Sequence, residues 1–157
     1  MDPLGNRKRP YAFKAGEGWT YRFGIDFSVK AGEVQDGSGA AFLEYVTRKG
    51  EEPPDHTHPT EDEIFYVLDG SVIFRCGGES FDLEKGGFIF LPRGIQHGYT
   101  IRSEGPVRLI VVTAPVGDGS SGGWAWRSRP LNASRCHRAA TAGSSPGRRD
   151  RSGSSSR

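Results

Sequence analysis

The sequence predicts an all-β domain, built from short strands as a sandwich or a barrel. First, short segments rich in aromatic and β-branched residues, which favour strands, recur between residues 20 and 116. Second, turns rich in Gly and Pro separate these segments. Third, no segment shows the apolar periodicity of an amphipathic helix. Many short strands joined by turns within one domain are typical of sandwiches and barrels.

The N-terminal residues 1–19 are polar and interrupted by Pro and Gly, so we expect a loose arm there. Tyr11, Phe13 and Trp19 would attach this arm to its own domain, the reading we favour, or to a second subunit. The first strand is expected at residues 21–29, where aromatic or apolar residues alternate with small or polar ones. Later strands are expected at residues 40–47, 64–68, 71–74, 80–83, 88–91, 96–101 and 107–114.

The most informative segment is residues 50–70, GEEPPDHTHPTEDEIFYVLDG. Its prolines disfavour a helix, so the chain before the strand is extended or turning. His56 and His58 are two residues apart, and on an extended chain both imidazoles point to the same side. Glu63 opens the apolar strand that follows, and an Asp-Gly pair ends that strand as a hairpin turn. Two imidazoles and a carboxylate near a rigid strand are typical metal ligands.

These residues have a spacing that resembles the first motif of the cupin superfamily: Gly50, five residues, His56-x-His58, four residues, Glu63, six residues, Gly70. The second cupin motif is matched by Gly86, five residues, Pro92-x-Gly94, two residues, His97. The short segment between the motifs, residues 71–85, is similar to that of small single-domain microbial cupins. Two spacings in the right order are far more specific than one short motif.

The resemblance implies the double-stranded β-helix, or jelly-roll barrel, of cupins. It implies that one divalent transition metal (Fe, Mn, Ni, Co, Cu or Zn) is held by His56, His58, Glu63 and His97. Such a set leaves coordination positions open for a substrate. One position departs from the family pattern, because Ile101 stands where Asn is frequent.

We do not expect the other acidic residues near the first motif, or the fourth histidine, to bind the metal. The motif spacing favours Glu63 as the ligand, and we expect Glu61 and Asp62 on a solvated turn. Asp55 is either a partner for an imidazole N–H or, as we favour, a solvated loop carboxylate. The fourth histidine, His137, lies in the C-terminal tail and is given no role.

A substrate pocket is expected on the ligand face of the strands. Counting alternately along each strand from Glu63 and from His97 brings apolar and aromatic residues to that face. The predicted pocket consists of Phe65, Phe74, Phe90, Tyr99 and Ile101. For Phe74 and Phe90 the alternative is ordinary core packing, whereas the Tyr99 hydroxyl would bond a metal-bound ligand.

The resemblance implies a dioxygenase-type enzyme of the quercetinase-like group. Its substrate would be small, aromatic or flavonol-like, with O₂ as the second substrate, and Glu63 would be the catalytic base. The alternatives are a non-catalytic cupin that binds or senses a small molecule, and a cupin isomerase or decarboxylase, because a fold does not set its chemistry. Cupins commonly form homodimers, and we expect one here through edge strands.

Composition divides the chain into an N-terminal arm at residues 1–19, a cupin barrel at 20–116 and a tail at 117–157. Up to residue 116 the chain has 13 Lys/Arg and 17 Asp/Glu, a net of −4, which argues against a nucleic-acid partner. The Ser-, Gly- and Arg-rich tail has 8 Arg and 2 Asp, a net of +6, and we expect it to be disordered. Its Arg residues fit a tail that binds nucleic acid or a membrane surface or, as we favour, a solvated extension without function.

The remaining signals concern the compartment. The N-terminus has no apolar stretch after its basic residues, and no apolar run approaches the roughly 20 residues of a membrane span. We therefore expect a cytoplasmic protein with no membrane partner. Cys76 and Cys136 are expected to be reduced and unpaired.

Overall fold

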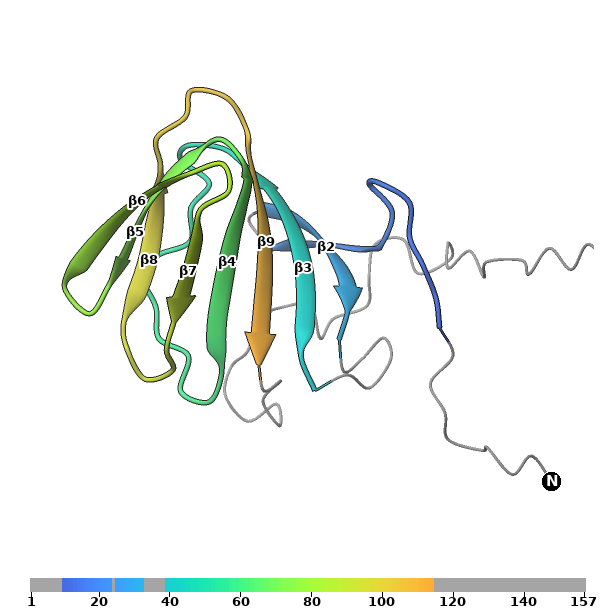
Figure 1. Ribbon diagram of the computed structural model, residues 1–157, viewed down its shortest axis with the longest axis horizontal. Helices are drawn as coiled ribbons and strands as arrows, with labels where there is room; N and C mark the ends of the chain where they lie inside the picture. The colour runs from blue at the N-terminus through green and yellow to red at the C-terminus, as the bar shows by residue number, and fades with distance from the viewer. Residues whose placement is uncertain (1–9, 24, 33–38, 115–157) are drawn as a thin grey trace, which may run out of the picture.

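The computed structural model describes residues 10–23, 25–32 and 39–114 (Figure 1). The described residues form strands and turns, with no helix among them. The strands are β1 Trp19–Phe23, β2 Ile25–Ala31, β3 Ala41–Thr47, β4 Asp62–Asp69, β5 Ser71–Cys76, β6 Glu79–Glu84, β7 Phe88–Leu91, β8 His97–Ile101 and β9 Val107–Ala114. The expected disordered tail, with Cys136 and His137, lies outside the described residues.

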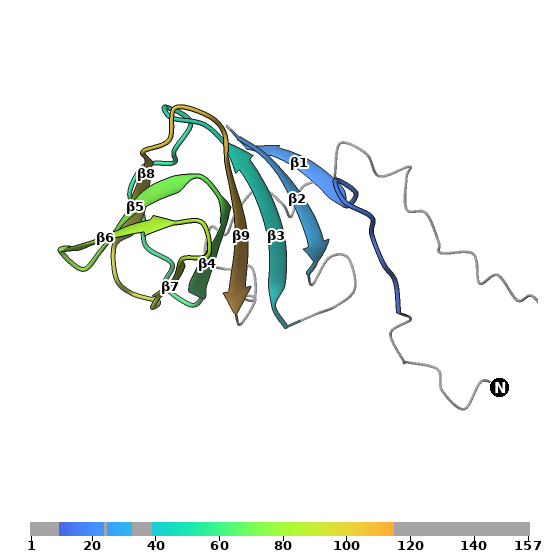
Figure 2. The same cartoon turned by 45° about the horizontal axis from the view of Figure 1, so that its top comes forward.

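Two antiparallel sheets make up the domain, as the jelly-roll prediction requires. The larger sheet has the strand order β1-β2-β3-β9-β4-β7, and the smaller has the order β6-β5-β8. Figure 2 shows the smaller sheet curving round to face β4 and β7, so that the two sheets enclose an interior. The all-β prediction is confirmed. No helix that is apolar and long enough to cross a membrane occurs among the residues placed in the structure.

The strand predicted at residues 21–29 is in fact two strands. Tyr21 in β1 pairs with Phe27 in β2, and the two strands run antiparallel. Alternation of apolar and polar residues continues through both strands, so the pattern does not reveal the reversal. The sequence signal for it is the single Gly24 between them. This hairpin adds a strand to the outer edge of the larger sheet.

The core lies between the sheets and follows the two-residue period of each strand. Buried and less buried residues alternate along β3 and β9, and the inward residues of β5 and β8 are almost fully buried. Aromatic rings form two groups within this core. Tyr21, Phe27 and Tyr45 pack at the β1–β3 end, and Phe65, Phe74 and Tyr99 pack between the two sheets.

The hairpin between β4 and β5 turns at Gly70, as its Asp-Gly pair predicts. Gly70 has φ of 88°, a region in which residues with a Cβ are strained. A Cβ at Gly70 would also lie 2.7 Å from Cγ2 of Val107. The turn therefore needs glycine both for its backbone and for the close approach of β9.

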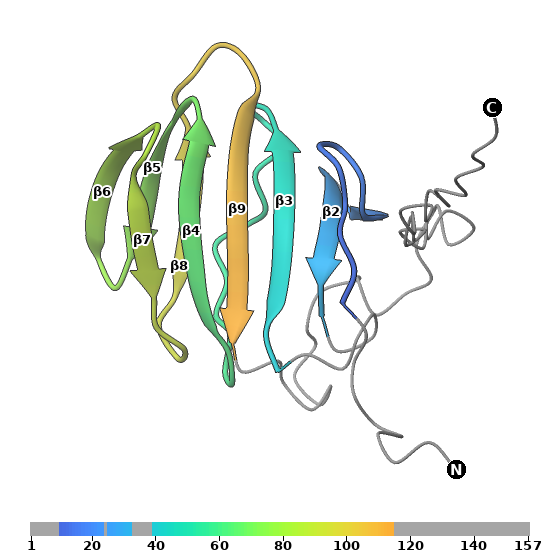
Figure 3. The ribbon, with the colours of Figure 1, turned by 45° about the vertical axis from the view of Figure 1, so that its right-hand side comes forward.

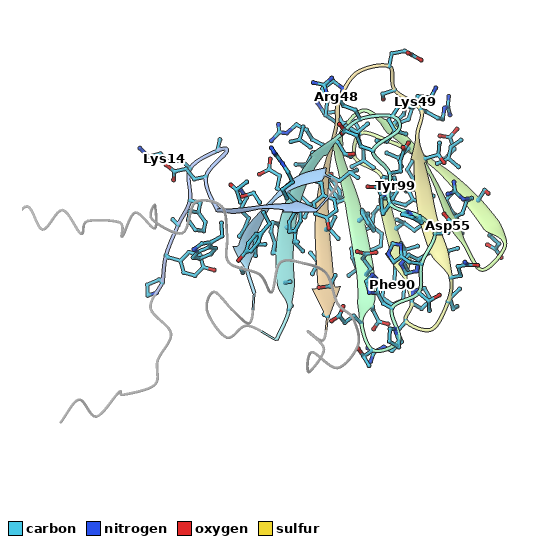
Figure 4. All side chains as sticks on the ribbon, turned by 180° about the vertical axis from the view of Figure 1, so that it is seen from behind. Lys14, Arg48, Lys49, Asp55, Phe90 and Tyr99 are labelled. Atoms are coloured by element: carbon cyan, nitrogen blue, oxygen red, sulfur yellow. The ribbon has the colours of Figure 1, made fainter. Side chains whose placement is uncertain are left out.

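The part of the N-terminal arm that the structure describes is attached to its own domain, as favoured. Tyr11, Phe13 and Trp19 pack edge to face with ring-centroid distances of 4.8–5.5 Å. The Tyr11 hydroxyl donates a hydrogen bond of 2.7 Å to the Lys30 carbonyl in β2. Figure 4 shows Lys14 of this arm well away from Asp55 and Tyr99.

Candidate metal centre

Four side chains converge at one end of the barrel: His56, His58, Glu63 and His97. One nitrogen or carboxylate oxygen from each lies within 4.8 Å of those of the other three. The first two come from the loop before β4, Glu63 from β4 and His97 from the start of β8. His58, Glu63 and His97 are buried, and His56 is half-buried. The four residues that the motifs single out are thus brought together from both sheets.

Backbone hydrogen bonds fix the histidine loop against β8. His56 and His97 exchange two N–H···O bonds of 2.9 Å each, which makes an isolated antiparallel bridge. The Gly94 N–H donates to the His58 carbonyl at 2.8 Å. The Ile101 N–H donates to the Glu52 carboxylate at 2.8 Å. Because these bonds join the two motifs directly, the site exists only when both are folded.

Backbone carbonyls orient two of the imidazoles. Nδ1 of His56 lies 2.9 Å from the Pro54 carbonyl, and Nδ1 of His97 lies 2.9 Å from the Ile95 carbonyl. A carbonyl only accepts, so each Nδ1 carries the proton and each Nε2 presents its lone pair. Partners of this kind fix the tautomer and the ring orientation of metal-binding histidines.

Glu61 lies buried beside the third imidazole, contrary to its predicted place on a solvated turn. It is only 3% exposed, and its Oε2 lies 3.6 Å from Nδ1 of His58. The missed signal is the two-residue period: Glu61 and Glu63 are two apart, so both point inward. Asp62, between them, points outward and pairs with Arg93 at 2.6 Å, which lowers its pKa to about 2.

The pKa values of two imidazoles in the cluster shift in opposite directions. Burial, with a smaller effect from the other two histidines, lowers the pKa of His58 more than the Glu63 carboxylate raises it, so His58 favours the neutral form that binds metals. Burial alone would also lower the pKa of His97, but the Glu63 carboxylate outweighs it and the pKa is raised. Glu63 Oε2 lies 3.4 Å from His97 Nε2 and 3.9 Å from His58 Nε2.

The donor set fits a divalent transition metal. Three imidazole nitrogens and one carboxylate oxygen suit Fe, Mn, Ni, Co, Cu or Zn, and none of them is specific for one of these ions. An Nδ1 proton held by an acceptor, with Nε2 turned into the cluster, is the arrangement in which histidine binds a metal. The side chains are close enough to share one ion.

Asp55 is an exposed loop carboxylate, as favoured, but it is also ion-paired. Its Oδ1 accepts a hydrogen bond of 2.7 Å from Nη2 of Arg75 in β5. Hydrogen bonding to Arg75 holds the pKa of Asp55 below its usual range. Asp55 also covers Gly98 in β8, where an added Cβ would lie 2.0 Å from Asp55 Oδ1. Figure 4 shows Asp55 beside the barrel interior that contains Tyr99.

Four of the five predicted pocket residues lie inside the barrel. The rings of Phe65, Phe74 and Tyr99 pack with centroid distances of 5.1–5.8 Å, and Ile101 is buried beside them. This packing is also ordinary core packing, which was the alternative for Phe74. The four residues form the interior wall next to the metal cluster.

Phe90 is not part of this wall, so its assignment to the pocket is wrong. It is 50% exposed and pairs with Ile64, which points away from Glu63 on β4. Strand β7 has only four residues and carries no ligand, so the sequence offers no inward residue from which to count along it. The inward residues of β7 are Ile89 and Leu91.

Two buried hydroxyls face the interior, and sequence reasoning found only one of them. The hydroxyls of Tyr99 and of Thr47, the last residue of β3, are buried without a hydrogen bond of good geometry to the described residues. Burial, reinforced by the charge of Glu63, raises the pKa of Tyr99 well above its usual range, so its hydroxyl stays protonated. Thr47 has no motif to mark it.

A two-sheet jelly roll with three histidines and one glutamate at one end defines the cupin class. The family model described as Cupin domain matches residues 43–113, which include both motifs and all four cluster residues. The chain therefore carries a small cupin domain.

Known proteins are similar to this chain in sequence or in fold. The protein TcmJ of the tetracenomycin polyketide synthase of Streptomyces glaucescens is 31% identical over 81 residues, 51% of this chain and 54% of that protein. Quercetin 2,3-dioxygenase of Bacillus subtilis is 32% identical over 111 residues, 70% of this chain and 33% of that protein. The chain thus spans about half or less of these relatives. A structure described as a predicted oxalate decarboxylase from Thermotoga maritima matches with a TM-score of 0.61, covering 68% of this chain and 100% of that one; at 17% identity it shows the fold alone.

Proposed function

We propose that this domain is a metal-dependent enzyme of the dioxygenase type, with O₂ and a small aromatic or flavonol-like molecule as its substrates. The observation that carries the proposal is the cluster of half-buried His56 with buried His58, Glu63 and His97 beside an aromatic interior. Similarity to a protein named quercetin 2,3-dioxygenase over 70% of this chain supports it. When bound, the metal would act as a Lewis acid toward a substrate oxygen.

Glu63 is the proposed proton acceptor. Its carboxylate is buried, and its ion-pair partners within the described residues are the imidazoles of His58 and His97. A carboxylate at the reacting end of the interior can accept a proton from a substrate hydroxyl, the role of a general base.

Tyr99 is the proposed substrate-positioning residue. Its hydroxyl is protonated at neutral pH, so it donates a hydrogen bond to an oxygen of the substrate. Phe65 and Phe74 exclude water from the same region and offer flat apolar surfaces to an aromatic ring. Together these residues favour a substrate that combines an aromatic ring with an acceptor oxygen.

A small-molecule binding protein without catalysis is the alternative. The same buried hydroxyls of Tyr99 and Thr47 favour it, because they would hold a polar ligand with no chemical step. Isomerase or decarboxylase chemistry on this fold is a further form of the enzyme proposal. Conversion of a substrate to product would distinguish an enzyme from a non-catalytic binding protein.

The test is O₂ consumption by protein reconstituted with Fe, Mn, Ni, Co, Cu or Zn, in the presence of flavonols and catechols. We expect one metal to support consumption that depends on substrate. Glu63→Gln should keep weakened metal binding and lose turnover by about 10²–10⁴, because an amide does not accept a proton. Asp62→Asn, on the outer face, is the matched control and should keep full activity. Tight ligand binding with no turnover for any metal would support the binding protein instead.

A further inference from the structure

The loop before β4 lies along β8, the edge strand of the smaller sheet. Its residues 52–58 carry the first two metal ligands, and we call them the ligand loop. His56 and His97 form an antiparallel bridge there. Antiparallel pairing places the preceding loop residue, Asp55, opposite Gly98 of β8, and the two residues are in close contact. The ligand loop therefore continues the strand order β6-β5-β8 by one more segment.

A row of three residues crosses this part of the sheet. Arg75 of β5 is paired with Gly98 of β8, and Asp55 lies on the other side of Gly98. Neighbouring strands are about 4.8 Å apart, so the backbones of Arg75 and Asp55 are separated by roughly 10 Å. Gly98 has no side chain, and the Asp55 carboxylate occupies the space where a Cβ would stand. The Arg75 side chain can therefore reach over β8 to the ligand loop.

The row lies on the outer side of the smaller sheet. Figure 3 shows β5 and β8 behind β7 and β4, so the outer side of the smaller sheet is turned away from the larger one. Along β5, Val72 and Phe74 are buried in the interior, whereas the side chains of Arg75 and Asp55 are 39% and 41% exposed. The contact is thus on the surface, although the ligands that the same loop carries converge in the metal cluster.

The Arg75 guanidinium makes three contacts. Its Nη2 donates to Asp55 Oδ1 at 2.7 Å, and its Nε donates a weaker bond of 3.4 Å to Asp55 Oδ2. Its Nη1 donates to the Thr100 hydroxyl of β8 at 2.7 Å. Isolated surface ion pairs contribute little, because both side chains must be held in one geometry. Here the two-point contact with the carboxylate and the bond to Thr100 fix the guanidinium in one orientation.

This ion pair adds a side-chain tie to the backbone bonds of the ligand loop. Those backbone bonds join the loop to β8 and to Gly94, whereas Arg75 belongs to β5, the central strand of the smaller sheet. Asp55 directly precedes His56, so a movement of Asp55 away from Gly98 also displaces the imidazole. His56 is half-buried and the other three ligands are buried. It is therefore the ligand for which an added tie matters most.

We propose that Arg75 is a positioning residue for the metal centre, because it holds Asp55 and thereby keeps the ligand loop in its metal-binding place. The spacing of the metal motifs does not indicate this role, since Arg75 lies between the two motifs and meets Asp55 only through the strand pairing. The proposal rests on the metal centre that the proposed function requires. It involves no reaction, so it is tested without any substrate.

The test compares the full-length wild type with Arg75→Gln, and circular dichroism confirms that both are folded. Competition with a chelator measures the affinity for Co²⁺, and the visible absorption of bound Co²⁺ reports on its ligands. NMR measures amide hydrogen exchange of His56 in the metal-depleted chain. We expect the affinity to fall and the exchange to quicken, each about 2–5-fold, the value of an exposed ion pair. The Co²⁺ spectrum should change, because His56 is held less firmly.

Three further variants identify the interaction. Arg75→Lys keeps the charge but not the planar fork, so it should recover part of the affinity. Asp55→Ala should match Arg75→Gln, and the double variant should be no worse than either, because each substitution removes the same contact. Arg102→Gln is the matched control and should match the wild type. Arg102 is 46% exposed and pairs with Asp82 of β6, at the end of β8 opposite to His97.

The proposal is overturned if Arg75→Gln binds Co²⁺ as tightly as Arg102→Gln, even with faster exchange, since the pair would then support the loop without positioning its ligands. It is equally overturned if the losses of Arg75→Gln and Asp55→Ala add in the double variant. A wild type that binds no Co²⁺ would overturn it together with the metal centre. Metal binding without O₂ consumption would contradict only the proposed enzyme, so the two failures are distinguishable.

Discussion

Glu61 is the residue whose role at the metal centre depends most on the fold. Its buried carboxylate faces Nδ1 of His58 at 3.6 Å, whereas His56 and His97 have backbone carbonyls at the same ring position. A backbone carbonyl is fixed by the strand pairing, but Glu61 is a side chain that a single substitution changes. His58 is therefore the most easily disturbed of the three imidazoles.

We predict that Glu61→Gln weakens metal binding about 10–100-fold, the usual effect of losing a partner that orients a metal-binding histidine. Competition with a chromogenic chelator measures the affinity. Asp62→Asn is the control, because Asp62 is the neighbouring carboxylate but pairs with Arg93 on the surface. Equal affinities for the wild type and Glu61→Gln would show that Glu61 does not orient His58.

Tyr99→Phe tests the buried hydroxyl. Because that hydroxyl has no hydrogen bond of good geometry to the described chain, its removal should leave the free energy of unfolding unchanged or slightly raised. Affinity for a substrate with an acceptor oxygen should fall about tenfold, the value of one hydrogen bond. Urea denaturation and ligand titration measure the two effects. A loss of stability greater than about 1 kcal/mol would mean that the hydroxyl has a protein partner instead.

Among the elements, β8 depends on a small residue where the histidine loop crosses it. An added Cβ at Gly98 would lie 2.0 Å from Asp55 Oδ1 and 3.2 Å from the Asp55 Cα. The carboxylate can rotate only by leaving Arg75, and the Cα can move only with the loop that carries His56. Gly98 thus allows the loop to lie close to the strand.

We predict that Gly98→Ala lowers the free energy of unfolding by about 1–3 kcal/mol, the range for overpacking. It should also weaken metal binding, since the clash displaces the His56 loop. Gly105→Ala is the matched control, because a Cβ there meets nothing within 4 Å. Thermal denaturation with and without metal measures both effects. If Gly98→Ala matches Gly105→Ala in both, the loop is not closely packed on β8.

The elements also show what the sequence could predict. The inward face is predicted correctly for strands that contain a metal ligand, because alternate residues can be counted from it. These strands are β4 with Glu63 and β8 with His97. Phe90 was misplaced because β7 carries no ligand from which to count. The prediction for Glu61 is wrong because Glu61, although it precedes β4, already follows the two-residue period of that strand and so points inward. The β1–β2 hairpin was hidden because alternation does not register a reversal of direction.

At the scale of the molecule, the strands that the structure describes end before the predicted C-terminal tail. Strand β9 ends at Ala114, and it lies between β3 and β4 in the middle of the larger sheet. We predict that truncation after Val116 leaves a folded domain that binds metal with unchanged affinity. Circular dichroism and metal titration measure this. Unfolding of the truncated chain at room temperature would show that residues beyond 116 belong to the core.

The two sides of the larger sheet differ in character. Its inner side supplies Glu63 and Phe65 to the metal centre and its surroundings, and its outer side exposes Tyr66, Phe88 and Phe90. The metal motifs predict which residues lie on the inner side, because the ligand spacing identifies Glu63 and thereby the inward face of its strand. The residues that share the outer side could not be predicted from the sequence, because they become neighbours only through the strand order that places β7, β4, β9 and β3 side by side.

The central claim is that His56, His58, Glu63 and His97 bind one divalent metal. Elemental analysis of the purified chain, reconstituted and then desalted, tests it most directly. We predict close to one metal ion per chain in the wild type and in His137→Ala, and almost none in His58→Ala or His97→Ala, because three remaining donors hold the ion far more weakly. Equal metal content in the wild type and His97→Ala would contradict the assignment.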